Sequence, residues 1–291
     1  MIKAFLRKYQ GSLCGKRVII SGCTGGIGSQ LCRYILTLGG ALVMLDRNQV
    51  KSEVLEKQLK SEFENADIKR ICANMQSIES VKAACEMLKG ISADILIHNA
   101  GAYKIPREKS DSGYDNVFTI NFISPYYITR QLKDCVKKTV IVGSIAHNYS
   151  KTDDTDIDFS RRNASYLVYG NAKRYLMYSH FELFKGTPKS LAVTHPGITL
   201  TGITDHYPKW LYVIIKPLMR VVFMKPKHAA LSVLAGFYDA TEPYSWIGPA
   251  VFDIWGGPKH RKIHTASKEE ISKIYNNAEK IYREISTTHA K

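Results

Sequence analysis

Residues 18–28 read VIISGCTGGIG, and this stretch decides the fold. Its first three residues form a short β-branched apolar run, which is typical of a buried strand. Glycines follow at positions 22, 25, 26 and 28, and Leu31, Ile35 and Leu38 then recur at helical spacing. Strand, glycine turn and helix in this order predict the start of a dinucleotide-binding unit, where the free N–H groups of a helix N-terminus attract a pyrophosphate. A glycine-rich turn that binds no ligand is the alternative.

The next apolar run ends at a carboxylate that could select the cofactor. Residues 41–45 read ALVML and are followed by Asp46, which lies 18 residues beyond Gly28. A carboxylate at roughly this distance commonly hydrogen-bonds the adenosine ribose, and its charge repels a 2′-phosphate. Asp46 therefore favours NAD. Arg47 allows NADP, because an arginine at this place can pair with the 2′-phosphate. A solvated charged pair at a strand end is the interpretation without a ligand.

Further apolar runs predict the remaining strands of one α/β domain. They lie at 71–73, 95–97, 140–142, 191–193 and 250–252, with amphipathic segments such as 50–63, 81–88 and 166–184 between them. Continuous apolar strands that alternate with helices predict a Rossmann-type, doubly wound parallel sheet of about seven strands, with helices on both faces. Ligands bind beyond the carboxyl ends of such strands. We therefore expect one edge to gather the residues that follow the strands, Asp46, Asn99, Ser144 and Pro196. The length of 291 residues suits a single domain, 1–291.

Tyr169 and Lys173 form the most informative pair of reactive side chains. Residues four apart share one face of a helix, so the phenol and the ammonium can point into the same cleft. A nearby cation lowers the pKa of a tyrosine, which would make the phenol a general acid/base usable near neutral pH. The spacing alone proves little, because four Tyr-x3-basic pairs occur where chance predicts about 2.4. The other three are Tyr103/Arg107, Tyr126/Arg130 and Tyr212/Lys216.

Six motifs, in their order along the chain, match a known family. They are Ser21-Gly22-x3-Gly26-Ile27-Gly28, His98-Asn99-Ala100-Gly101, Asn121, Ser144-x-Ala146-His147, Tyr169-x3-Lys173 and Pro196-Gly197-x3-Thr201. On these motifs the chain resembles the short-chain dehydrogenase/reductase family over nearly its whole length. Two positions depart from the family pattern. Asn74 stands where an aspartate near the adenine is usual, and Gly143 replaces the serine that commonly precedes the catalytic serine.

The resemblance implies a role for each matched residue. Tyr169 would exchange a proton with the substrate oxygen, and Ser144 would hydrogen-bond that oxygen. Lys173 would hold the nicotinamide ribose and lower the tyrosine pKa, while Asn121 would anchor a water that relays protons. The hydride would move to or from NAD or NADP, and no metal is required. The implied cofactor-binding residues are Ser21, Gly22, Thr24, Gly26, Ile27, Gly28, Asp46, Arg47, Asn74, Asn99, Ala100, Gly101, Tyr169, Lys173, Pro196, Gly197, Ile198 and Thr201.

The spacing of 25 residues from Ser144 to Tyr169 resembles the retinol-dehydrogenase-like branch of the family, as does the Ser-x-Ala-His sequence. The added segment carries aspartates at 153, 154, 156 and 158, a spacing similar to the start of a calcium loop. Phe159 and Ser165 stand where such a loop needs glycine and glutamate. We therefore interpret the segment as a solvated acidic loop. His147 either lines the substrate pocket or is a satisfied loop histidine.

Cysteine usage and the N-terminus favour a reducing compartment. The six cysteines form no CxxC motif, which indicates reduced thiols and neither a disulfide framework nor a zinc site. Residues 1–10 carry three basic residues and lack an uninterrupted apolar core, so they form no convincing signal peptide. We expect a cytoplasmic protein.

The formal net charge of +15 calls for an anionic partner. Nucleic acid is disfavoured, since the basic residues are dispersed and no nucleic-acid-binding motif occurs. Residues 209–225 are strongly apolar with interspersed cations, yet the segment is shorter than the roughly 20 residues of a spanning helix. In the resembled family the stretch near 200–227 forms a substrate lid, which would make this segment an apolar wall. Peripheral contact of 209–225 with a membrane is the other interpretation, and the two are compatible.

These observations predict an NAD(P)-dependent oxidoreductase. It would interconvert an alcohol and a carbonyl on an apolar small molecule such as a steroid, a retinoid or a fatty aldehyde. The resemblance also implies a homo-oligomer, because family members often assemble through helices that flank the active site. A non-catalytic redox sensor or scaffold that keeps the nucleotide site is the alternative from another class. The glycine-loop spacing and the modest carboxyl-terminal length argue against a dehydratase or epimerase that binds a nucleotide-sugar.

Overall fold

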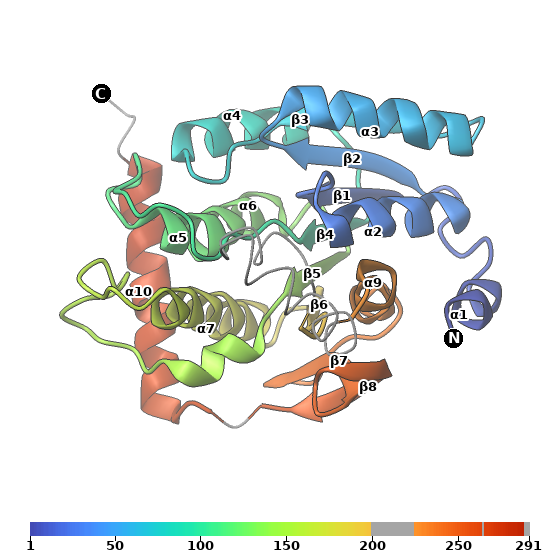
Figure 1. Ribbon diagram of the computed structural model, residues 1–291. Coiled ribbons are helices and arrows are strands. Elements are labelled where there is room, and N and C mark those ends of the chain that lie inside the picture. The colour runs from blue at the N-terminus through green and yellow to red at the C-terminus, as the bar shows by residue number, and fades with distance from the viewer. Residues whose placement is uncertain (199–223, 264, 288–291) are drawn as a thin grey trace, which may run out of the picture.

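An eight-stranded sheet forms the centre of the computed structural model, which describes residues 1–198, 224–263 and 265–287 (Figure 1). The strands are β1 Arg17–Ser21, β2 Ala41–Asp46, β3 Ile68–Cys72, β4 Ile95–His98, β5 Lys138–Val142, β6 Ser190–Thr194, β7 Ser245–Val251 and β8 Trp255–Lys262. Their order is β3-β2-β1-β4-β5-β6-β7-β8, and every neighbouring pair is parallel except β7 with β8. The predicted doubly wound parallel sheet is confirmed. The order reverses between β1 and β4, which is where such a sheet binds its ligand.

Successive residues of the central strands point to opposite faces of the sheet, and both faces are buried. Ile19 and Val43 pack into one layer, whereas Val18 and Ile20 pack into the other. Because both faces are covered, these strands are apolar at nearly every position, which is why they stand out in the sequence. All six cysteines are free.

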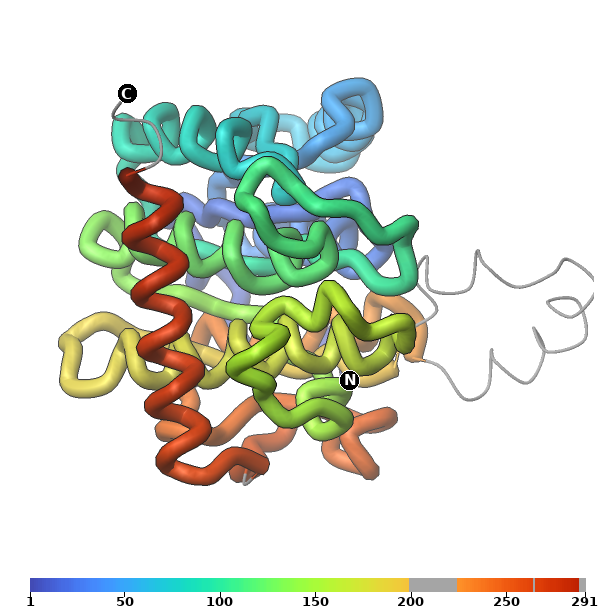
Figure 2. The backbone as a smooth tube through the Cα atoms, turned by 90° about the vertical axis from the view of Figure 1, so that its left-hand side faces the viewer, coloured from blue at the N-terminus to red at the C-terminus, as the bar shows by residue number. Residues whose placement is uncertain are grey.

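Two layers of helices cover the sheet (Figures 1 and 2). One layer holds α2 Gly26–Thr37, α3 Gln49–Glu62 and α9 Pro226–Ala235, with the short α1 Ile2–Lys8 packed beside it. The other holds α4 Ile78–Lys89, α5 Asn116–Phe118, α6 Ser124–Leu132 and α7 Ser165–Phe184. A π-helical turn, Thr119–Ile123, joins α5 to α6, and a 3-10 helix, Ile145–Tyr149, follows β5. Helix α10, Lys268–Thr287, crosses the outside of this second layer.

Helix α10 covers helices that the resemblance implies as an oligomer interface. Glu270 of α10 pairs with Arg174 of α7, and Glu279 pairs with Arg130 of α6. An oligomer contact through this face of α6 and α7 would require α10 to move. The homo-oligomer itself stays a prediction.

Three strands differ from the sequence-based prediction. β7 begins at Ser245, five residues before the predicted run at 250–252, because a glycine and a proline interrupt the apolar pattern of SWIGPAV, and Phe252 lies in the turn after the strand. β3 begins at Ile68, three residues before the predicted run at 71–73, because Lys69 and Arg70 interrupt the apolar pattern. The sequence does not predict β8, since WGGPKHRK contains two glycines, a proline and three Lys or Arg residues. This edge strand forms through its antiparallel pairing with β7, not through its own propensity. The predicted helices at 50–63, 81–88 and 166–184 correspond to α3, α4 and α7.

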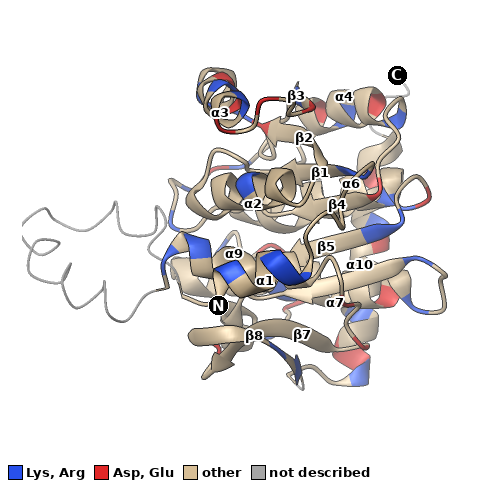
Figure 3. Cartoon of the chain, turned by 90° about the vertical axis from the view of Figure 1, so that its right-hand side faces the viewer, with Lys and Arg blue, Asp and Glu red and all other residues tan. Residues whose placement is uncertain are grey.

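Helix α1 is amphipathic and lies on the side of the molecule that carries α9 (Figure 3). Ile2, Phe5 and Leu6 pack against the core, and the ring of Tyr9 stacks on that of Tyr238 with 3.6 Å between centroids. The Lys and Arg residues of α1 occupy the opposite, exposed face. None of the helices in the described part of the chain combines the length and the apolar composition needed to cross a bilayer.

Candidate active site

The glycine turn after β1 is packed too closely for other residue types at two positions. Gly22 has a φ of +74°, and a Cβ atom there would lie 2.9 Å from the Cα of Ala100. A Cβ atom at Gly28 would lie 2.1 Å from the carbonyl oxygen of Gly22. Helix α2 begins at Gly26, and no side chain caps its N-terminus. The backbone N–H groups of its first turn can therefore receive a pyrophosphate, which fits the nucleotide that the motif implies.

A hydrogen-bonded junction joins the ends of β1 and β4 beside this turn. The hydroxyl oxygen of Ser21 accepts from the backbone N–H groups of Asn99 at 3.2 Å and Ala100 at 3.1 Å. The side-chain amide of Asn99 donates to the carbonyl oxygens of Ser21 and Gly22, each at 3.0 Å. These residues, all predicted to bind the cofactor, thus hold the glycine turn in position.

The Asp46 carboxylate is buried and already has three donors. It accepts from the backbone N–H and the hydroxyl of Thr24, at 3.1 Å and 3.3 Å, and from the hydroxyl of Ser52 at 3.0 Å. Arg47 is exposed. Asp46 therefore ties the end of β2 to the glycine turn and keeps a negative charge at the end of that strand. The sequence-based prediction misses Ser52 in α3, because no motif marks it.

Tyr169 meets Ser144 just beyond the carboxyl end of β5. The two hydroxyls are hydrogen-bonded, and the ring of Tyr103 contacts the Tyr169 ring edge-on with 5.3 Å between centroids. Burial raises the pKa of Tyr169 to about 12, and the hydrogen bond with Ser144 offsets only part of this rise. The lowered pKa expected from Lys173 is therefore not found, since burial outweighs any effect of the cation. The phenol keeps its proton through the neutral range, which suits a general acid.

Lys173 lies beside the Tyr169 ring, with 5.7 Å from Nζ to the ring centroid. Its Nζ atom donates to the carbonyl oxygen of Val142 at 2.9 Å, and burial lowers its pKa to about 8. A Cβ atom at Gly101 would lie 3.6 Å from this Nζ and 2.9 Å from Oδ1 of Asn121. Lys173 and Asn121 are therefore neighbours, and the four predicted catalytic residues share one site.

Asn121 lies in the π-helical turn between α5 and α6. Its side-chain amide donates to the carbonyl oxygens of Ala102 and Val117, both at 2.8 Å. These two bonds fix the side chain between the helix and the segment that follows β4. Single π-helical turns inside α-helices occur frequently at functional sites.

Comparison with known proteins agrees with this geometry. The family model for short chain dehydrogenases matches residues 16–153. Retinol dehydrogenase 12 of Mus musculus is 28% identical over 217 residues, which are 68% of this chain and 69% of that protein. Polyprenol dehydrogenase of Danio rerio is 21% identical over 236 residues, 76% of this chain and 73% of that protein. A crystal structure of an uncharacterized protein from Mycobacterium Paratuberculosis shares the fold, with a TM-score of 0.73 at 19% identity, over 94% of this chain and 97% of that one.

The matched family model and these relatives support a member of the short-chain dehydrogenase/reductase family. Its relatives place it in the retinol-dehydrogenase-like branch, so it is an NAD(P)-dependent enzyme that acts on CH–OH and C=O groups.

The structure gives a local role to each of the two residues, Gly143 and Asn74, that depart from the family pattern. A Cβ atom at position 143 would lie 2.8 Å from Sδ of Met177, so Gly143 lets α7 approach the end of β5. The Oδ1 atom of Asn74 accepts from the backbone N–H of Gln76 at 3.2 Å and shapes the turn before α4. Neither departure alters Ser144.

His147 supports the backbone at Ser144. Its Nδ1 atom donates to the carbonyl oxygen of Ser144 at 2.7 Å, and its ring packs edge-on against Trp246. The side chain is buried, and its Nε2 atom has no hydrogen-bond partner among the described residues, so His147 holds the start of the 3-10 helix through Nδ1.

His98, at the end of β4, takes part in a buried relay of hydrogen bonds. His180 Nδ1 donates to the carbonyl oxygen of Leu176 at 2.7 Å, so its Nε2 accepts from the hydroxyl of Thr129 at 2.9 Å. The Thr129 oxygen must then accept from Nε2 of His98, at 2.8 Å. Burial lowers the pKa of both histidines, which keeps them neutral. The relay fixes the end of β4 to α6 and α7, a role that the sequence does not predict.

The Pro196–Gly197 motif directly follows β6. The N–H of Met224 donates to the carbonyl oxygen of Ile198 at 2.9 Å, so the two described ends on either side of residues 199–223 meet here. Thr201 lies outside the described residues, as do most of the predicted lid near 200–227 and of the segment 209–225.

The two other Tyr-x3-basic pairs that lie within the described residues do not form a second site of this kind. Tyr126 and Arg130 both bind the carboxylate of Glu279 in α10, and Tyr212/Lys216 lies outside the described residues. Tyr103 is different, because it contacts the Tyr169 ring. The sequence-based prediction misses this neighbour of the phenol.

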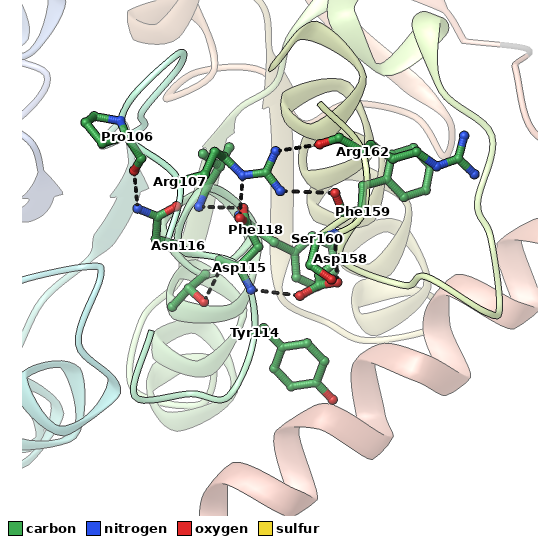
Figure 4. A network of polar contacts seen from close by, with 12 residues as sticks. Pro106, Arg107, Tyr114, Asp115, Asn116, Phe118, Asp158, Phe159, Ser160 and Arg162 are labelled. Atoms are coloured by element: carbon green, nitrogen blue, oxygen red, sulfur yellow. Dashed lines mark hydrogen bonds and ion pairs between the residues drawn. The ribbon is translucent and has the colours of Figure 1, made fainter. Parts of the chain in front are cut away.

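The acidic segment before α7 is only partly the solvated loop that the sequence predicts, since Asp154 is exposed but two other aspartates are buried. Asp156 and Asp158 are only 6% and 9% exposed. Asp158 accepts from the backbone N–H groups of Asp115 at 2.7 Å and Ser160 at 3.1 Å (Figure 4). For Asp156 and Asp158 the prediction is wrong, because a facing segment supplies donors to the Asp158 carboxylate, which composition cannot reveal.

Arg107 fastens the same segment to the loop before α5 (Figure 4). Its Nη1 and Nη2 atoms donate to the carbonyl oxygens of Arg162 and Phe159, each at 3.0 Å, and its Nε pairs with Asp115. We call Arg107, Asp115 and Asp158 the carboxylate clamp.

The carboxylate clamp links the two helical segments that carry Asn121 and Tyr169, two of the predicted catalytic residues. The Asp115 side chain caps α5, which continues into the turn that holds Asn121. On the other side, Phe159 is buried against Val168, directly before Tyr169. The added segment therefore braces the wall of the site.

Proposed function

We propose that this enzyme interconverts an alcohol and a carbonyl on an apolar small molecule, with Tyr169 as the general acid/base. One observation carries the proposal: the Tyr169 phenol has the Ser144 hydroxyl as a hydrogen-bond partner and the Lys173 ammonium beside its ring. The proposal includes one catalytic domain, 1–291, with a substrate lid near 200–227.

In the reducing direction, the Tyr169 hydroxyl gives its proton to the carbonyl oxygen of the substrate. The Ser144 hydroxyl donates a hydrogen bond to the same oxygen and fixes its position. Lys173, held at the Val142 carbonyl, stabilises the phenolate that remains. Asn121 adjoins Lys173 and would position a water for reprotonation. The bound nicotinamide supplies the hydride in this direction and takes it in the other.

The proposed cofactor site extends from the glycine turn to the Pro196–Gly197 motif. The N-terminus of α2 would hold the pyrophosphate, and Asn74 would lie near the adenine. We propose NAD as the preferred cofactor, because Asp46 keeps a carboxylate at the end of β2. Arg47 is exposed and gives NADP a possible partner for its 2′-phosphate.

Two observations support an apolar substrate. The relatives are named for retinol and polyprenol, which are long apolar alcohols. The described residues on either side of 199–223 meet next to Gly197, beside the expected nicotinamide wall, and the apolar stretch 209–225 lies between them in the sequence. Contact of this stretch with a membrane and a cytoplasmic location are parts of the same proposal.

The test follows oxidation of NADH and of NADPH by the purified protein with aldehydes and ketones of increasing apolar length. We expect efficiency to grow with apolar length, and Tyr169→Phe to lower kcat by about a thousandfold or more. Tyr166→Phe is the matched control, since this exposed tyrosine lies in the same helix and should leave kcat unchanged. Nucleotide binding without turnover in the wild type would instead favour the redox sensor or scaffold.

A further inference from the structure

Arg174 follows Lys173 directly in α7, and its side chain is buried. The side chain is only 1% exposed, although arginine is almost never fully buried unless it is paired. It packs against the ring of Tyr178, with 5.3 Å from Cζ to the ring centroid. The proposed reaction does not use this charge, so its burial needs another explanation.

The Arg174 guanidinium makes five hydrogen bonds, as many as it has N–H groups. Nε and Nη2 donate to the two carboxylate oxygens of Glu270 in α10, at 2.7 Å and 2.6 Å. Nη2 also donates to the carbonyl oxygen of Thr265, and Nη1 to the hydroxyl of that residue at 3.3 Å. The fifth bond runs from Nη1 to the carbonyl oxygen of His147, at 3.0 Å.

The His147 carbonyl links the guanidinium to the active site. The 3-10 helix that contains His147 begins directly after Ser144. The backbone N–H and the Nδ1 atom of His147 both donate to the carbonyl oxygen of Ser144, at 3.1 Å and 2.7 Å. One residue therefore joins the guanidinium of Arg174 to the backbone of Ser144.

The segment 144–152 is also held against its neighbours at two other points. A Cβ atom at Gly170 would overlap the carbonyl oxygen of Ala146, so α7 and the 3-10 helix touch with no side chain between them. Glu270 accepts from the backbone N–H and the hydroxyl of Thr152, at 3.1 Å and 3.3 Å. The pair of Arg174 and Glu270 thus contacts this segment both within the 3-10 helix and beyond it.

The ion pair is better suited to fixing geometry than to adding stability. Burial alone would raise the pKa of Glu270, but the hydrogen bonds from Arg174 and Thr152 lower it below its usual value. The carboxylate therefore stays ionised at neutral pH. The cost of removing two charges from water cancels much of their attraction, so a buried pair is weak evidence for stability. Its two parallel N–H···O bonds, in contrast, hold the planar guanidinium in one orientation.

We propose that Arg174 is a positioning residue, which holds the Ser144 hydroxyl where the substrate oxygen requires it. Glu270 orients the guanidinium, and the guanidinium fixes the His147 carbonyl and with it the backbone that carries the serine. Helix α10, which crosses the outside of α7, thereby becomes part of the scaffold of the active site (Figure 2). The inference rests on the proposed function, in which the Ser144 hydroxyl binds the substrate oxygen.

The first test is a double-mutant cycle on kcat for carbonyl reduction. Arg174→Met keeps the length of the side chain and removes its donors, so we expect kcat to fall by about thirtyfold while KM changes by less than about threefold. In a Ser144→Ala background the same substitution should lower kcat by less than about threefold, because no hydroxyl is left to position. An equal factor in both backgrounds would overturn the proposal.

Arg130→Met is the matched control for the attachment of α10. Arg130 also pairs with a carboxylate of this helix, Glu279, but in the described part of the chain its side chain reaches α10 and not the segment 144–152. The variant should lower the melting temperature and leave kcat within about twofold of the wild type. A loss of kcat as large as in Arg174→Met would mean that α10 acts only as a general support, and would overturn the proposal.

A second substitution separates positioning from stability. Arg174→Met combined with Glu270→Gln removes the unpaired carboxylate but keeps an acceptor for the Thr152 N–H. We expect this double variant to regain melting temperature relative to Arg174→Met, because no buried charge is left alone, and to keep the low kcat. Recovery of kcat together with the melting temperature would assign Arg174 a merely structural role.

Amide hydrogen exchange tests the hold on the segment without any turnover. The N–H groups of Ala146 and His147 both donate to Ser144, so their exchange reports on this contact. Arg174→Met should speed their exchange by about tenfold or more, and Arg130→Met should not. Unchanged exchange would overturn the proposal even in an active enzyme. Faster exchange in Arg174→Met, with a wild type that reduces no carbonyl, would refute the proposed function alone and support the hold on Ser144.

Discussion

The Nζ atom of Lys173 donates a hydrogen bond of 2.9 Å to the carbonyl oxygen of Val142. This bond holds the ammonium at the end of β5, beside the Tyr169 ring and away from bulk water. Burial lowers the lysine pKa to about 8 and raises the tyrosine pKa to about 12. Lysine, not tyrosine, is therefore the group that titrates near neutral pH.

This order of pKa values predicts the pH dependence of carbonyl reduction. Lys173 is charged below about pH 8 and neutral above it, and the phenol stays protonated throughout this range. We expect kcat/KM to fall as pH rises through about 8, because the neutral amine no longer stabilises the phenolate. Lys138 is the control, since burial also lowers its pKa to about 8 but it lies at the other end of β5. Lys138→Gln should leave the profile unchanged, and a wild-type rate that stays flat through this range would contradict the prediction.

Cofactor choice can be divided between two adjacent residues. Arg47→Ala should lower kcat/KM with NADPH by about tenfold, because a charge-assisted contact to the 2′-phosphate is lost, and should leave NADH unaffected. Asp46→Asn should lower the ratio of kcat/KM with NADH to kcat/KM with NADPH. Steady-state kinetics with both cofactors check this, and an equal loss with NADH and NADPH in Arg47→Ala would show that the arginine has no role in selection.

We expect that adding one methyl group in the glycine turn lowers both the stability of the protein and its affinity for NADH. Gly28→Ala places a carbon 2.1 Å from the Gly22 carbonyl oxygen, so we expect a loss of about 3 kcal/mol in the free energy of unfolding, together with weaker NADH binding. Gly90→Ala is the control, because the nearest atom to its Cβ would be 3.8 Å away. Urea denaturation and titration of NADH fluorescence measure the two effects. Similar stabilities of both variants would refute the close packing at the turn.

The carboxylate clamp predicts unequal effects of two aspartates in one segment. Asp158→Asn leaves one of two backbone N–H groups without an acceptor, which should lower the free energy of unfolding by about 1–3 kcal/mol. It should also lower kcat, because the segment that positions Tyr169 is held less firmly. Asp154 forms only an exposed ion pair with Lys273, so Asp154→Asn should cost less than about 1 kcal/mol. Denaturation midpoints and kcat provide the comparison. Equal costs would mean that Asp158 does not brace the site.

Much of the fold could be predicted because burial leaves a local record. Strands covered on both faces are continuous apolar runs, as at 41–45. The glycines of the turn after β1 indicate where two backbone segments approach each other closely. The edge strand β8 leaves no such record, since its residues are polar and its pairing with β7 forms only in three dimensions. The composition of the acidic segment likewise could not predict the burial of Asp156 and Asp158, because that burial depends on contacts that form only in three dimensions.

The sequence by itself determined that Tyr169 and Lys173 share a helix face, because four residues make about one turn. It also set the glycine turn and the order of the motifs. Only the tertiary structure decided how deeply the Tyr169 phenol is buried, and burial reversed the expected direction of its pKa. Desolvation depends on all neighbouring segments at once, so the spacing of two residues cannot give its size.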